Sequence, residues 1–111
     1  MKRLLPLLFA VSLLVPGQAA FALTDRADLE KWCQRSSAAA VGRCYGYLRA
    51  AADVLASDSI DGVRACLPRD IELPEMHRLL RDWLSAHPAA MTTSAMGLVA
   101  RALAARYPCP K

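Results

Sequence analysis

Apolar residues recur at helical spacing in four stretches of the chain, and no stretch alternates with the period of two that is typical of a strand. The clearest stretch includes Pro74, which suits the first turn of a helix, and stops at His87-Pro88. Its apolar positions follow i, i+3, i+4, i+7 and i+8: Met76, Leu79, Leu80, Trp83 and Leu84. We expect a helix here, and we expect Trp83 and Trp32 to lie in the core.

Three further helices are predicted at about residues 26–35, 38–56 and 91–107. Thr24 or Asp25 is expected to cap the first helix, and Ser36 or Ser37 the second. The polar segment before the third helix contains two residues that break helices, so most of residues 57–73 should form a loop. The pattern predicts an all-α fold, a small bundle of about four helices with short connections.

The second helix contains a glycine where a better helix former is expected. Gly46 should cost about 1 kcal/mol relative to alanine. It leaves a notch on the side of the helix away from Cys44, bordered by Tyr45 and Tyr47. We expect another backbone to approach this notch closely. That backbone belongs either to another helix of the bundle, which we favour, or to a second protein.

Residues 1–22 have the organisation of a secretory signal peptide. A basic start, Met1-Lys2-Arg3, precedes an apolar run from Leu4 to Val15, and small residues end the segment at Ala20 and Ala22. The apolar run is too short for a membrane span, which needs about 20 residues. We therefore expect cleavage after Ala22 and a periplasmic domain, residues 23–111, that is not attached to the membrane.

Cleavage also changes the charge of the protein. Loss of Lys2 and Arg3 from the 14 basic residues leaves 12 against 10 acidic ones, a net charge of +2. The remaining chain has neither an arginine cluster nor a stripe that alternates aromatic and basic residues. Nucleic acid is therefore an unexpected partner.

All four cysteines lie in the expected mature domain: Cys33, Cys44, Cys66 and Cys109. An even number of cysteines in a small exported chain indicates two disulfides, and the absence of a C-x-x-C pair argues against a metal site. Three pairings are possible. We favour Cys33–Cys109 with Cys44–Cys66, because this pairing would pin both ends of the bundle and the longest loop.

Four motifs occur in order along the chain: CYGYLRAAAD, CLP, LLRDWLSAHP and ALAARYPC. Together, between Cys44 and Cys109, they resemble the Rap/Tai family of periplasmic immunity proteins of type VI secretion systems. The matching positions look like scaffold residues rather than toxin contacts: Cys44, Gly46, Tyr47, Cys66, Pro68, His87, Pro88, Tyr107, Pro108 and Cys109.

The resemblance implies an all-helical fold with structural disulfides, without catalysis and without a cofactor. It also implies a homodimer that binds a secreted amidase effector, an enzyme that cleaves peptidoglycan, and obstructs the active-site cleft of that enzyme.

A preformed loop inserted into a cleft would achieve such inhibition at low ordering cost. The best candidate residues are Ser57, Asp58, Ser59 and Asp61, which are polar and are held at the far end of their loop by Cys66. The two carboxylates could meet a basic rim on the toxin and speed the encounter. A second candidate is the joint before the fourth helix, residues 91–94.

Two alternatives have less support. Catalysis would have to use His77 and His87, which are ten residues apart and lack an activated nucleophile nearby. We instead expect His77 on the surface and His87 at a helix end. A small periplasmic stress or chaperone-like protein with no toxin partner would also be helical and disulfide-bonded, and this is the remaining alternative.

Overall fold

The computed structural model describes residues 23–111, so the predicted signal peptide lies outside the described residues. The described part of the chain forms four helices: α1 (Arg26–Cys33), α2 (Ala38–Leu55), α3 (Leu73–Ala86) and α4 (Ala95–Arg106). Extended pairing in these residues is limited to isolated bridges, Ile60 with Val63 and Ala65 with Pro108. The predicted all-α fold is confirmed.

Short polar side chains begin the first two helices. The Asp25 carboxylate accepts a hydrogen bond from the Asp28 amide (2.8 Å), and Asp28 accepts one from the Asp25 amide (3.3 Å), so the two residues form a capping box at α1. Ser37 caps α2 by accepting from the Ala40 amide. These observations select Asp25 and Ser37 from the two pairs that the sequence left open.

The last helix begins later than its sequence predicts. Ser94 is extended, with φ −132° and ψ 158°, and α4 starts at Ala95 instead of near residue 91. The Ala95 amide donates to the Thr24 carbonyl oxygen at 2.7 Å, which ties the start of α4 to the segment before α1. A long-range contact therefore fixes a boundary that local periodicity placed too early.

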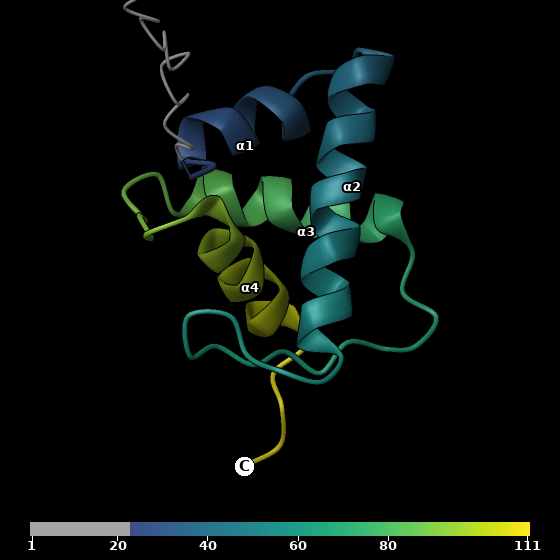
Figure 1. Cartoon of the computed structure of the whole chain (residues 1–111), viewed down its shortest axis with the longest axis vertical. Coiled ribbons are helices and arrows are strands. Elements are labelled where there is room, and N and C mark those ends of the chain that lie inside the picture. Colours follow the sequence, from purple (N-terminus) through teal and green to yellow (C-terminus); the bar gives the residue numbers. More distant parts are fainter. Residues whose placement is uncertain (1–22) are drawn as a thin grey trace, which may run out of the picture.

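Helix α4 is the most buried helix of the bundle. It contacts each of the other three helices. Helix α3 crosses behind α2, and α1 lies beside the N-terminal end of α2 (Figure 1). Its buried residues surround most of its circumference: Ala95, Gly97, Leu98, Val99, Ala100, Ala102 and Leu103. A helix that is apolar on nearly every side belongs inside a core, and this burial explains why α4 lacks the strong amphipathic pattern of α3.

Arg26 joins the first and third helices. Its guanidinium donates to the carbonyl oxygens of Leu84 (2.8 Å), His87 (2.6 Å) and Ala90 (2.9 Å), and its Nε donates to Glu30 (2.7 Å). Its side chain is only 11% exposed. The carbonyl groups at the C-terminal end of a helix lack partners within the helix and carry partial negative charge. Arg26 satisfies them at the end of α3 and holds the following turn.

The disulfides connect different cysteines from those we favoured. Cys33 pairs with Cys44, and Cys66 pairs with Cys109. The favoured pairing is wrong because Cys33 lies where α1 meets α2, whereas the C-terminal tail lies at the other end of the bundle (Figure 1). The prediction that all four cysteines are bonded is confirmed.

The two bridges close separate parts of the chain. They join residues 11 and 43 positions apart. In the chain-entropy description these loops stabilise the fold by roughly 3 and roughly 4 kcal/mol, respectively. The first bridge fixes the angle between α1 and α2, and the second fastens the C-terminal tail to the loop between α2 and α3.

The tail after α4 is also held by hydrogen bonds. The Cys66 amide donates to the Tyr107 carbonyl oxygen at 2.8 Å, next to the bridge between Ala65 and Pro108. The Tyr107 hydroxyl donates to Glu75 at 2.9 Å, and this bond is the main cause that raises the pKa of Tyr107. These contacts bring Cys109 beside Cys66, a proximity that the sequence pattern did not reveal.

Three aromatic side chains differ from their predicted environments. Trp32 and Trp83 are half-buried at the edge of the core, where Trp32 packs edge-on against Tyr47 and Trp83 stacks on His87. His77 is half-buried instead of lying on the surface, because its Nε2 donates to the Cys33 carbonyl oxygen (2.5 Å) and its ring meets Tyr45. His87 does lie at the end of α3, as predicted.

Replacing Arg26 should destabilise the fold strongly. Arg26→Met keeps the apolar stem but leaves three carbonyl groups without their charged donor. We expect a loss of about 2–4 kcal/mol in the free energy of unfolding, measured by urea denaturation of the oxidised domain. Arg101→Met, at an exposed position of α4, is the control and should stay within about 0.5 kcal/mol of the parent. Equal stability of the two variants would contradict the role given to Arg26.

Candidate functional site

The predicted toxin-binding loop contains a tight hairpin. Ile60 and Val63 exchange two backbone hydrogen bonds of 3.0 and 2.9 Å around the turn residues Asp61 and Gly62. Both turn residues have positive φ, 51° and 74°. Two positive φ angles define a type I′ turn, for which Asp-Gly is a preferred sequence. The segment that the sequence predicted as a loop is therefore a short, specified structure.

The residues before the hairpin are fixed to the end of α2. The amides of Ser57 and Asp58 both donate to the Val54 carbonyl oxygen, at 3.2 and 2.9 Å. The Asp58 carboxylate accepts from the Ser59 amide at 2.7 Å, while the side chains of Ser57 and Asp58 remain exposed. Asp58 thus presents a charge to solvent from a backbone whose direction is set by the helix.

Asp61 faces the bundle more closely than its sequence suggests. Its carboxylate lies against Gly97 of α4, where a Cβ atom on residue 97 would overlap both Asp61 Oδ2 and the Thr92 side chain. Gly97 is buried. The absence of a side chain at residue 97 allows Asp61 to approach the helix. Gly97 was not among the predicted site residues, and its place within an apolar helix is the one signal of its role in the sequence.

The structure brings the two candidate segments together. Thr92 belongs to the joint at residues 91–94, and it meets the same point of α4 as Asp61. The Thr92 hydroxyl donates to the Ser94 carbonyl oxygen, and the Met91 side chain is 67% exposed. We call residues 57–63 and 91–94 together the two-loop surface. Two segments about 30 positions apart in the sequence thus form one surface next to α4.

The first loop of this surface, residues 57–63, is held at its far end by Cys66, as the sequence suggested. The disulfide partner of Cys66 is Cys109 and not the predicted Cys44. Residues 65 and 66 pair with the tail at Pro108 and Tyr107. Together with the contacts at Val54 and Gly97, this attaches the loop at its beginning, middle and end. A loop restrained in this way loses little conformational entropy when it binds.

Gly46 is not a point of close packing within this chain. No atom in residues 23–111, beyond its own helix, lies within 4 Å of the position that its Cβ would take. The interpretation that we favoured, approach of another helix of the bundle, is therefore wrong, because the notch opens to solvent. Approach of a second protein stays a prediction. Tyr47, which borders the notch, packs against Trp32, and burial raises its pKa.

The remaining motif residues lie around joints of the scaffold. His87 ends α3, where its Nδ1 donates to the Trp83 carbonyl oxygen at 2.8 Å, and Pro88 follows in the turn held by Arg26. Pro68 accepts a hydrogen bond from the Ile71 amide in the segment that leads to α3.

Across residues 23–111, no group of three or more His, Cys, Asp or Glu side chains is placed to hold a metal ion. Both histidines donate to backbone carbonyl groups. None of the described helices is long and apolar enough to cross a membrane.

The fold and the surface define a small, disulfide-bonded, all-α domain that presents a restrained pair of loops. The family model of Rap1a immunity proteins matches residues 25–109, and the chain belongs to this family. This match confirms the resemblance drawn from the cysteine, proline and tyrosine motifs, and it makes the chain a toxin-immunity protein. Neither a curated protein nor a solved structure matches the chain.

The contact at Gly97 can be tested by adding one methyl group. Gly97→Ala should push away Asp61 and Thr92 and cost about 1–3 kcal/mol of unfolding free energy, because the site is already filled. Gly42→Ala is the matched control, since Gly42 is also helical but faces open space. That variant should gain up to about 1 kcal/mol from the higher helix propensity of alanine. Thermal and urea unfolding measure both changes, and a stabilised Gly97→Ala would refute the close contact.

Proposed function

We propose that this protein is a periplasmic immunity protein that binds a peptidoglycan amidase effector of a type VI secretion system and obstructs its active-site cleft. The observation that carries the proposal is the two-loop surface on a chain of the Rap1a immunity family. Its backbone is restrained before any partner binds, and pre-organised surfaces change little on association. The exposed Asp58 carboxylate suits a basic rim around a cleft.

The proposed location agrees with the sequence and with the family. Rap1a immunity proteins are generally periplasmic, and a cleavable signal peptide at residues 1–22 would deliver this chain there. Two disulfides favour an oxidising compartment outside the cytoplasm. The immunity protein would then meet the effector where peptidoglycan is exposed to it.

Charge changes in the first loop should weaken effector binding. Because Asp61 has positive φ and packs on Gly97, asparagine is the suitable replacement there, and lysine is suitable at Asp58. Asp58→Lys with Asp61→Asn should lower the affinity at least tenfold, which is about 1.4 kcal/mol. Calorimetry with the purified cognate amidase effector measures the affinity.

The control carries the same change in net charge elsewhere. Asp82→Lys with Glu72→Gln alters exposed residues of α3 and its N-terminal boundary, and it should bind like the parent. If both double variants bind equally well, the loop is not the contact surface. If the parent neither binds the effector nor protects cells against it, the proposed function itself is wrong.

We also propose that the protein is a homodimer. The resemblance to the Rap/Tai family supports this proposal, and so does the exposed face of α2, where Gly42, Gly46 and Ala50 leave a strip without long side chains. Light scattering of the oxidised domain should give twice the mass of one chain at micromolar concentration. A monomer mass over the whole concentration range would overturn this proposal and leave effector binding intact.

A further inference from the structure

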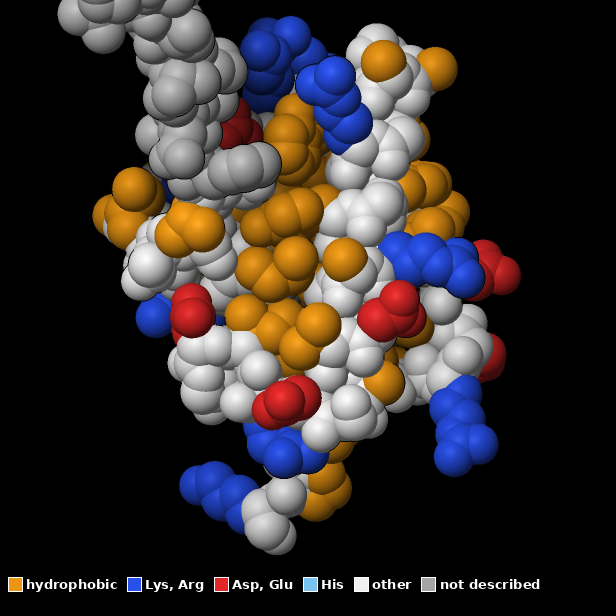
Figure 2. Space-filling model, in the orientation of Figure 1, with side chains coloured by type: hydrophobic (Ala, Val, Ile, Leu, Met, Phe, Trp, Pro, Cys, Tyr) orange, Lys and Arg blue, Asp and Glu red, His pale blue; other side chains and the backbone are white. Residues whose placement is uncertain are grey.

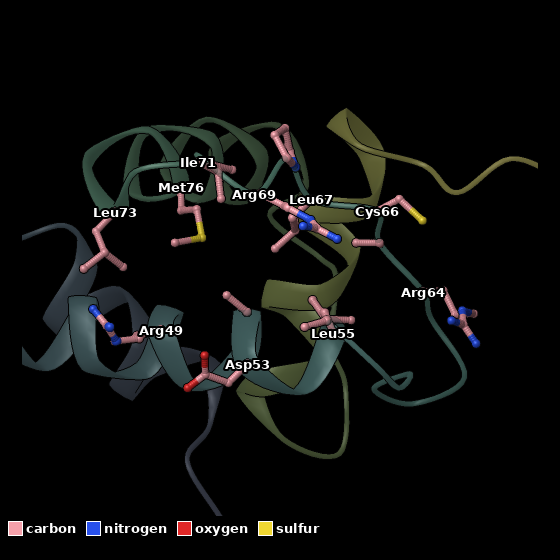
Figure 3. Close-up of a pocket in the computed structure, with 14 residues that line it drawn as sticks. Arg49, Asp53, Leu55, Arg64, Cys66, Leu67, Arg69, Ile71, Leu73 and Met76 are labelled. Atoms are coloured by element: carbon pink, nitrogen blue, oxygen red, sulfur yellow. The ribbon is translucent and has the colours of Figure 1, made fainter.

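An open cleft of about 680 Å³ lies between the C-terminal half of α2 and the segment that leads from Cys66 into α3 (Figure 3). Its floor is aliphatic. Leu55 and Met76 are buried in it, while Leu67, Ile71 and Leu73 remain half-exposed. Apolar area that stays in contact with water gains free energy when a partner covers it.

Three arginines line this cleft, and Asp53 is the acidic residue that accompanies them. Figure 3 shows Arg49 on the α2 wall, Arg69 on the opposite wall and Arg64 at the outer end. Within residues 23–111, the ion pairs involve Arg26 and Arg78, so all three cleft arginines keep their charge uncompensated by a carboxylate within 4.0 Å. The cleft therefore combines an apolar floor with an excess of positive charge.

The cleft adjoins the two-loop surface. Ala56, which directly precedes the first loop, and Arg64, which directly follows the hairpin, both line it. The two surfaces have opposite properties: the hairpin side projects and carries Asp58, while the cleft is concave and basic. Figure 2 shows acidic and basic side chains close together at the end of the molecule that carries the C-terminal tail. A partner large enough to engage the loop would also face the cleft.

The lining also limits the chemistry of what enters. It contains no aromatic side chain on which a nucleic-acid base could stack. The Cys66 sulfur points out of the cleft, toward its bond with Cys109, so the disulfide does not occupy the floor (Figure 3). Aliphatic walls with guanidinium groups at the edge match an aliphatic side chain next to a carboxylate.

We infer that this cleft binds an acidic segment of the effector, in which an aliphatic side chain enters the floor and a neighbouring Asp or Glu meets Arg49 and Arg69. The inference rests on the proposed function, since it assigns a second contact to the same partner. The effector would thus present a basic rim to the loop and an acidic, apolar segment to the cleft. Opposite charges at two adjacent contacts would fix the orientation of the complex and select against partners that carry only one of them.

Two pairs of variants test the cleft by calorimetry with the purified effector. Arg49→Glu with Arg69→Glu should weaken binding at least tenfold, whereas Arg43→Glu with Arg101→Glu makes the same charge change at exposed residues outside the cleft and should bind like the parent. Ala52→Trp fills the floor without changing charge and should also weaken binding tenfold. Ala105→Trp, at an exposed position of α4 outside the cleft, is its control and should bind like the parent.

The outcomes separate this inference from the proposed function. If the parent binds and both cleft variants bind as their controls do, the inference is overturned and the proposed function stands. If the parent does not bind, both are overturned. Should the arginine variant unfold, as circular dichroism would show, the Ala52→Trp pair alone decides the matter.

The charge of the partner segment has its own test. Acidic surface residues of the effector are replaced by lysine, one at a time. The affinity of each effector variant is then measured for the immunity protein that carries Arg49→Glu with Arg69→Glu. At least one replacement should restore binding to this variant while leaving the Arg43→Glu, Arg101→Glu control unimproved. If every replacement fails to restore binding, the partner segment is not acidic and the inference is overturned.

Discussion

Close packing around α4 is the constraint on which the rest of the structure depends. The helix uses alanine, glycine, leucine and valine on nearly every side, and all three other helices pack against it. Small side chains permit close packing because they leave room for the side chains of the neighbouring helices. At Gly97 the absence of a side chain admits Asp61 and Thr92, so the packing that forms the core also determines where the two candidate loops lie.

The attachments at the edge of the bundle complete this arrangement. Arg26 satisfies the carbonyl groups at the end of α3, one disulfide closes the corner between α1 and α2, and the other secures the tail. A domain of this size buries a smaller fraction of its surface than a large protein does. Its rigidity therefore rests on a few strong contacts at the ends of helices as well as on the core.

Much of the fold could be predicted because it depends on local pattern. The spacing of Met76, Leu80 and Leu84 identified the buried face of α3, and short polar residues marked the first two helix starts. The disulfide pairing could not be predicted in this way, because it depends on which helix ends meet in space. Arg26 illustrates the same limit, since its three acceptors lie about 60 positions further along the chain.

The candidate surface was predicted in parts rather than as a whole. Its two segments are polar and lie next to helix ends, which the sequence shows. Their meeting at Gly97 requires the position of α4 relative to both loops, and one glycine in an apolar helix does not specify that position. The basic cleft was missed for the same reason, because Arg49 and Arg69 lie on different walls and are 20 positions apart in sequence.

The order of the cysteines has a consequence for biogenesis. Each bridge joins cysteines that are consecutive along the chain, the first with the second and the third with the fourth. Under the proposed export with the N-terminus first, these thiols would emerge in the same order. Oxidation of each pair as it emerges would then produce the native connectivity directly, without the slow thiol exchange that an interleaved arrangement would require.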